Sequence, residues 1–126
     1  MSQQSSAVPF VLVGVAMIVG GEPMRRRRVG LNMMYGLRTR ATFADKTVWY
    51  DANRYAGRLL ERDGAVICVA AVVLPRLTEG RWVTEVLAGL TIACAVTSSL
   101  MSIRYANRLL AARSAPHEES SRNATG

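Results

Sequence analysis

The chain has 126 residues, of which half are apolar and only 6% aromatic, and its formal net charge is +7. This length predicts a single domain, and the charge lies in blocks between apolar runs, a pattern typical of membrane proteins that argues against nucleic-acid binding. The single histidine, His117, lies in a polar tail, and the sequence has no nucleophile, metal-binding or nucleotide-loop motif. We therefore predict no enzyme, no cofactor and no metal site.

The first apolar run covers residues 7–21 and predicts a transmembrane helix. It is shorter than the roughly 20 residues that cross a bilayer without tilt, although Gly14, Gly20 and Gly21 would permit close contact with another helix. Four arginines, residues 25–28, follow directly. We interpret them as the charged anchor that fixes the orientation of this helix, with binding of anionic lipid head groups as the alternative.

A long polar segment, residues 22–63, separates the first apolar run from the second. It mixes arginine, asparagine, threonine, tryptophan, tyrosine and glycine, whereas a plain linker would be rich in Gly, Ser or Pro. Gly36 between bulky neighbours indicates a turn. Thr42 followed by Asp45 has the form of a capping box, which predicts that a helix starts there.

The helix that starts at Thr42 is predicted to be amphipathic and to lie on the cytoplasmic side. At about 100° per residue, the residues on its outer face are Lys46, Asn53, Arg54, Arg58 and Glu61. The residues of its apolar arc are Val48, Trp49, Ala52, Tyr55, Ala56, Leu59 and Leu60. Such a helix either lies in the membrane interface or packs against other helices.

The second apolar run, residues 65–74, is too short to cross a bilayer alone. A continuous helix from about residue 43 to about residue 77 would supply the missing length, so we predict a transmembrane helix at 64–77 that extends the amphipathic one. The pair Asp63-Gly64 often ends a helix. If the helix continues, Gly64→Ala is predicted to be neutral or mildly stabilising, and if Gly64 caps a helix it is predicted to destabilise.

The third apolar run, residues 82–103, is long enough to span a membrane, with Trp82 and Tyr105 as interfacial anchors at its two ends. Hydroxyl side chains on this run are interpreted as contacts between helices, and they are Thr91, Thr97, Ser98 and Ser99. Residues 114–126 lack large apolar side chains and are predicted to form a disordered tail.

Together these runs predict an all-α integral membrane protein with three transmembrane helices in one membrane domain, residues 1–113. Lys and Arg number ten in residues 22–63, four after the third run, and two in the turn before it. Because positively charged loops face the cytoplasm, we predict a multi-pass protein of the plasma (inner) membrane with its N-terminus outside and its C-terminus cytoplasmic. Cys68 and Cys94 lie in apolar runs and are predicted to be free thiols.

The polar segment resembles the signature of the SdpI family of bacterial membrane proteins. That signature is an Asn, an aromatic-Gly-aliphatic-Arg-Thr run, a Thr, and then Trp and Asn four residues apart. The matching residues are Asn32, Tyr35, Gly36, Leu37, Arg38, Thr39, Thr42, Trp49 and Asn53. The resemblance covers about residues 32–105, so the chain corresponds to the signature module of the family. It implies a role in immunity to secreted peptide toxins or in membrane signalling.

The signature residues are predicted to form a binding site. The candidates are Asn32, Tyr35, Gly36, Arg38, Thr39, Thr42, Trp49 and Asn53. We expect Arg38 to carry binding, because its guanidinium can hold a carboxylate or phosphate through two parallel hydrogen bonds. In the structural alternative, Arg38 pairs with Asp45 or Asp51, and Asn53 satisfies backbone groups of the loop.

The functional prediction is an SdpI-like membrane protein of the immunity or signalling type. It would contact membrane lipids and bind a peptide, a lipid or a protein partner without catalysis, either as one chain or as a homo-oligomer. The first alternative is an accessory subunit of a larger membrane complex. A less favoured alternative is a lipid-handling or hydrolytic membrane enzyme, built from Asn32, Arg38, Thr39, Asp45 and Asn53.

Overall fold

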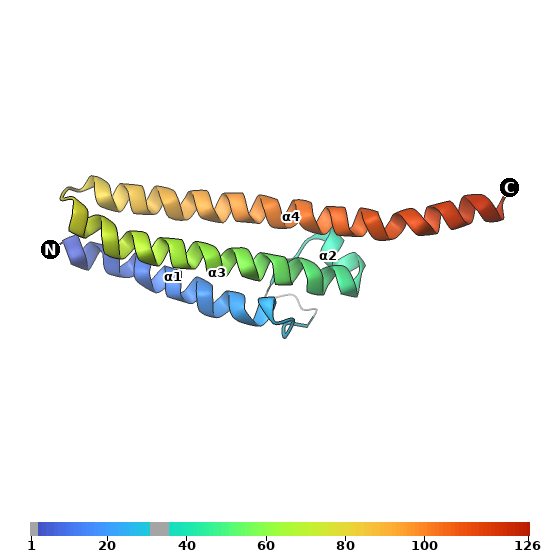
Figure 1. Ribbon diagram of the computed structural model, residues 1–126, viewed down its shortest axis with the longest axis horizontal. Helices are drawn as coiled ribbons and strands as arrows, with labels where there is room; N and C mark the ends of the chain where they lie inside the picture. Colours follow the sequence, from blue (N-terminus) through green and yellow to red (C-terminus); the bar gives the residue numbers. More distant parts are fainter. Residues whose placement is uncertain (1–2, 31–35) are drawn as a thin grey trace.

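The computed structural model describes residues 3–30 and 36–126, and every regular element in these ranges is an α-helix (Figure 1). The helices are α1 (Gln3–Arg25), α2 (Arg40–Ala44), α3 (Lys46–Leu77) and α4 (Trp82–Ala124). The three long helices α1, α3 and α4 lie side by side, each antiparallel to the next, and α3 packs against both of the others. The all-α prediction is confirmed.

The long helix α3 passes through Gly64 without a break, and α1 lies close to it there. A Cβ atom added to Gly64 would lie 2.5 Å from the carbonyl oxygen of Gly14, and one added to Gly14 would lie 2.7 Å from the carbonyl oxygen of Gly64. Gly21 and Gly57 make the same reciprocal contact, at 2.7 and 2.6 Å. The two glycine pairs lie two turns apart and let the helix backbones touch.

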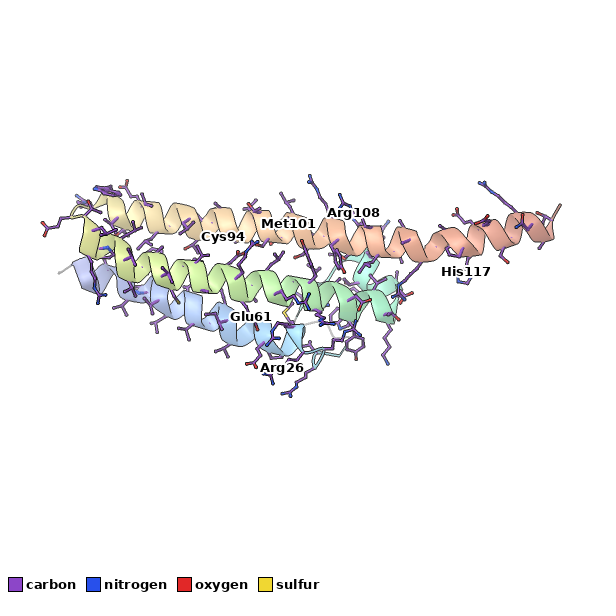
Figure 2. All side chains as sticks on the ribbon, viewed as in Figure 1. Arg26, Glu61, Cys94, Met101, Arg108 and His117 are labelled. Carbon is purple, nitrogen blue, oxygen red and sulfur yellow. The ribbon has the colours of Figure 1, made fainter. Side chains whose placement is uncertain are left out.

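The arginine run at residues 25–28 ties the end of α1 to α3. The side chain of Arg25 binds Glu61 with 2.9 Å between Nε and Oε2, and Glu61 lies between α3 and the end of α1 in Figure 2. Arg27 has a positive φ of 60° in the turn that ends α1, and its guanidinium binds Asp51. The predicted orientation anchor therefore also forms ion pairs within the fold.

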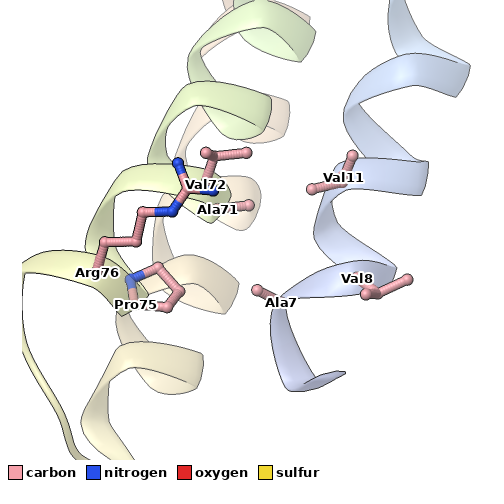
Figure 3. Close-up of a pocket in the computed structure, with 7 residues that line it drawn as sticks. All are labelled: Ala7, Val8, Val11, Ala71, Val72, Pro75 and Arg76. Carbon is pink, nitrogen blue, oxygen red and sulfur yellow. The ribbon is translucent and has the colours of Figure 1, made fainter. Parts of the chain in front are cut away.

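Apolar clusters hold the two ends of the bundle. The cluster near the N-terminus consists of Ala7, Ala71, Val83 and Leu87, and the cluster at the opposite end consists of Ala41, Val48, Ala52 and Ala106. The small side chains of Ala7 and Ala71 leave a hollow of about 240 Å³ between α1 and α3, with Pro75 and Arg76 at its edge (Figure 3). Packing at both ends thus depends on small residues.

The last helix, α4, continues beyond the bundle (Figure 1). Its 43 residues correspond to about 65 Å at ~1.5 Å per residue. The predicted disordered tail at residues 114–126 differs from the structure, in which the helix continues to Ala124 and its exposed last turns carry His117 (Figure 2). The physical reason is that extending an existing helix does not repeat the cost of nucleation.

Two helices in the described ranges are long and apolar enough to cross a membrane, as judged by length and composition. They are α1, over Ser6–Arg25, and α4. The predicted crossing at residues 64–77 lies within α3, whose N-terminal half is polar, and it stays a prediction. Cys68 and Cys94 are free thiols, as predicted.

Candidate functional site

The loop before α2, whose described residues 36–39 belong to the signature, is called here the signature loop. It folds back onto the first turns of α3 through Asn53. The backbone N–H of Leu37 donates to Asn53 Oδ1 at 2.6 Å, and Asn53 Nδ2 donates to the carbonyl oxygen of Trp49 at 2.8 Å. Asn53 is only 1% exposed, so its predicted position on the outer face is wrong. Its amide satisfies a backbone group of the loop, as the structural alternative expected.

Gly36 fits this turn for two separate reasons. Its φ of +99° lies in the region that glycine adopts without strain. A Cβ atom at this position would also lie 2.5 Å from Asn53 Oδ1. A larger residue would therefore strain the backbone and push the loop away from the amide that holds it.

Trp49 anchors the loop from the inside. It is fully buried, and its indole Nε1 donates to the carbonyl oxygen of Val29 at 2.9 Å. The centroid of its ring lies 5.5 Å from that of Phe43 in α2. This one side chain therefore connects the segment that follows α1, the short helix α2 and the start of α3.

The capping box lies one turn earlier than predicted. Thr39 and Thr42 form it at the start of α2, where the N–H of Thr39 donates to Thr42 Oγ1 at 2.8 Å and the N–H of Thr42 donates to Thr39 Oγ1 at 3.3 Å. The expected box between Thr42 and Asp45 is therefore wrong. Both threonine hydroxyls take part in the fold of the loop.

Asp45 instead caps the start of α3. Its Oδ1 accepts the backbone N–H groups of Thr47 at 2.7 Å and of Val48 at 3.3 Å. These two hydrogen bonds hold the pKa of the Asp45 carboxyl below its ordinary value, and the nearby charge of Arg113 acts in the same direction. Arg113 also binds Asp51, with 3.4 Å between Nη2 and Oδ2. The charged groups at this end thus connect α3 to α4.

The structure brings together most of the predicted site residues. Those that converge around α2 and the first turns of α3 are Gly36, Thr39, Thr42, Trp49 and Asn53. Arg38 lies in the same loop with its side chain exposed. Asn32 and Tyr35 lie outside the described residues. The buried part of the signature shapes the loop, and among the signature residues that the structure describes, Arg38 is the exposed one.

A cavity of about 350 Å³ lies beside the folded loop, between α1, α3 and α4. Gly36 and Leu37 form part of its wall, so the signature loop closes one side of it. Most of the lining is apolar. The polar side chains that line it are Asp63 of α3 and Ser98, Ser99 and Ser102 of α4.

Asp63 is a buried carboxylate at this cavity, with 2% of the residue exposed. The hydroxyl of Ser98 donates to its Oδ2. Arg62 donates to its Oδ1 from Nε at 3.1 Å and from Nη2 at 2.9 Å, while 55% of the Arg62 side chain is exposed. The carboxylate is therefore held by one partly buried hydroxyl and one exposed cation.

Sequence reasoning missed Asp63 as a site residue, because it treated the residue only as a possible helix end. A signal was present in the spacing. Trp49, Ala52, Ala56 and Leu59 follow one another at intervals of three and four residues along one face, and Asp63 is the next position on that face. A carboxylate that continues an apolar stripe is unusual, because burying a charge is costly unless it is paired.

Comparison with known proteins identifies the family. The family model for the SdpI/YfhL protein family matches residues 28–101, which is more than half of the chain and includes the signature and Asp63. The chain belongs to the SdpI/YfhL family. The resemblance inferred from the sequence is confirmed.

Two relatives in the SdpI/YfhL family come from Bacillus subtilis (strain 168). The immunity protein SdpI is 31% identical over 101 residues, which cover 80% of this chain and 45% of that protein. The uncharacterized protein YfhL is 39% identical over 44 residues, which cover 35% of this chain and 40% of that protein. The chain thus spans less than half the length of either relative. No solved structure matches it.

Proposed function

We propose that this chain is a membrane protein of the immunity or signalling type, which binds a peptide, lipid or protein partner without catalysis. The observation that carries the proposal is its membership of a family in which a relative with 31% identity is an immunity protein. The apolar helices α1 and α4 support a place in the membrane. Arg38 is the proposed contact for the partner, because it is the exposed arginine of the signature.

The arrangement of the loop disfavours the enzyme alternative. Of the residues from which such an enzyme would be built, Thr39, Asp45 and Asn53 bind backbone N–H groups of the loop and of the helix starts. A general acid or base must be free to reach a substrate proton. These three side chains serve instead to fix the loop conformation.

The proposed topology has three membrane crossings in the plasma (inner) membrane, with the N-terminus outside and the C-terminus in the cytoplasm. It follows from the distribution of basic residues. In a background with Cys68→Ala and Cys94→Ala, we expect Ser5→Cys to react with a membrane-impermeant maleimide in intact cells. Ser114→Cys should react only after the cells are permeabilised. Labelling of both positions from outside would contradict three crossings.

Arg38→Lys tests the proposed binding role. Lysine keeps the charge but cannot form two parallel hydrogen bonds, so binding of the partner should weaken about tenfold or more while the amount of folded protein stays the same. The measurement is survival of host cells that express each variant in medium conditioned by Bacillus subtilis, the organism of the immunity relative. Protein level in the membrane is measured in parallel.

The matched control is Arg40→Lys, the same exchange at an exposed arginine two positions away. It should leave both survival and protein level unchanged. If Arg38 is structural, Arg38→Lys should instead lower protein level and thermal stability. Normal levels of Arg38→Lys with full protection would show that neither role is correct.

A further inference from the structure

We propose that the cavity beside the signature loop binds a cationic amphiphile, such as an aliphatic amine, with its apolar body in the cavity and its ammonium group at Asp63. This inference goes beyond the proposed function, because it assigns a small-molecule site and does not depend on a role in immunity. It rests on the size of the cavity, its lining, and the charge at its polar end.

The size and lining of the cavity match those of ligand sites. Its volume of about 350 Å³ falls within the range of roughly 300–1,000 Å³ that small-molecule pockets occupy. Such pockets are mainly apolar with a few polar groups that orient the ligand. The apolar side chains here are Met17, Met24, Leu37, Ala56, Leu60 and Ala95. The two methionines can adapt to ligands of different shape.

The polar end of the cavity selects for positive charge. Asp63 is buried, and a buried carboxylate needs a counter-charge. Arg62 supplies one at present, but more than half of its side chain is exposed, so its guanidinium can turn into solvent while an incoming ammonium takes its place. The hydroxyl of Ser98 can stay on the carboxylate or rotate to accept from the ligand. An anionic head group could not replace Arg62 as the counter-charge of this carboxylate.

The test uses as its reporter a cysteine at position 99, which lines the cavity and is also exposed, so that a reagent can reach it. Ser99→Cys is placed in a background with Cys68→Ala and Cys94→Ala, and its reaction with a maleimide is timed in detergent micelles. The probes are octylamine, octan-1-ol and octanoate, which share a chain length and differ in head-group charge. We expect octylamine to slow the reaction about tenfold more than octanoate does, with octan-1-ol in between. Thr97→Cys, which is exposed on the same helix but does not line the cavity, reports changes in the micelle alone and should not be protected.

Replacing Asp63 tests whether its carboxylate causes the preference for a positively charged head group. Asp63→Asn keeps an acceptor for Ser98 but removes the charge, and it should weaken protection by octylamine about tenfold without changing the effect of octan-1-ol. Asp51→Asn, the same exchange outside the cavity, should leave protection unchanged. Equal protection by octylamine and octanoate, no protection by octylamine, or full protection in a folded Asp63→Asn variant would each overturn the proposal. If Asp63→Asn does not fold, the comparison of the three probes with Asp63 intact decides.

Discussion

Gly64→Ala should destabilise the protein by about 1–3 kcal/mol, the usual cost of inserting a methyl group into a packed contact. The new Cβ atom would lie 2.5 Å from the carbonyl oxygen of Gly14, 2.9 Å from Ile18 Cγ1 and 3.1 Å from Met17 Cβ. The carbonyl oxygen of Gly14 belongs to the backbone and cannot turn away as a side chain could, so α1 and α3 must move apart. The better helix propensity of alanine, about 1 kcal/mol, offsets only part of this cost.

This expectation differs from the sequence-based prediction for a continuous helix, and the destabilisation has another cause than the helix cap considered there. The helix does continue through Gly64, and helix propensity alone would make the substitution neutral or mildly stabilising. The contact with Gly14 instead makes the expected change in stability unfavourable. The control is Gly89→Ala in α4, where the added Cβ would meet nothing within 4 Å and only the propensity term acts. Thermal unfolding in detergent, followed by circular dichroism, should show a lower midpoint for Gly64→Ala and an equal or higher one for Gly89→Ala. Equal midpoints for both variants would contradict the glycine contact.

Asn53→Leu should release the signature loop from α3. Leucine has a similar size but leaves the N–H of Leu37 without its acceptor and the carbonyl of Trp49 without its side-chain donor. An unsatisfied buried polar group costs about 1–3 kcal/mol. Because the N–H that loses its acceptor belongs to the loop, the substitution should destabilise the folded loop more than the helices. Trypsin should therefore cut faster after Arg38 and Arg40, while cleavage elsewhere changes little.

The matched control for this prediction is Asn107→Leu, the same exchange at an exposed position of α4, which should leave the cleavage pattern unchanged. Mass spectrometry of the early fragments separates local release from global unfolding, since global unfolding would speed cleavage at every arginine. A rate of cleavage after Arg38 that does not differ between Asn53→Leu and the unchanged protein would show that Asn53 does not hold the loop.

The sequence predicted well those features that depend on local pattern. Long apolar runs identified the all-α fold, and the length argument identified continuity of α3 through Gly64. The unusual residues of the signature also marked the loop as special. Their role was harder to predict, because the groups that bind Asn53 and Trp49 are backbone atoms of the same loop, and backbone atoms leave no trace in the sequence.

Features that depend on contact between distant segments were not predictable from one segment at a time. The spacing of glycines on α1 suggested a close helix contact, but nothing in the first run identifies Gly57 and Gly64 as its partners. Asp63 was missed for a related reason. Asp63 is bound by Ser98, which lies on another helix. In the sequence, Ser98 looks like any other hydroxyl residue of a membrane helix.

The continuity of α4 gives the molecule the geometry of a lever. From Ser98, where it meets Asp63, to Ala124 the helix measures roughly 39 Å at about 1.5 Å per residue. A tilt of about 5° at that contact would displace the far end by roughly 3 Å. Arg113 lies along this arm and binds Asp45 and Asp51, so the same tilt would pull directly on the first turns of α3 and the loop that they hold.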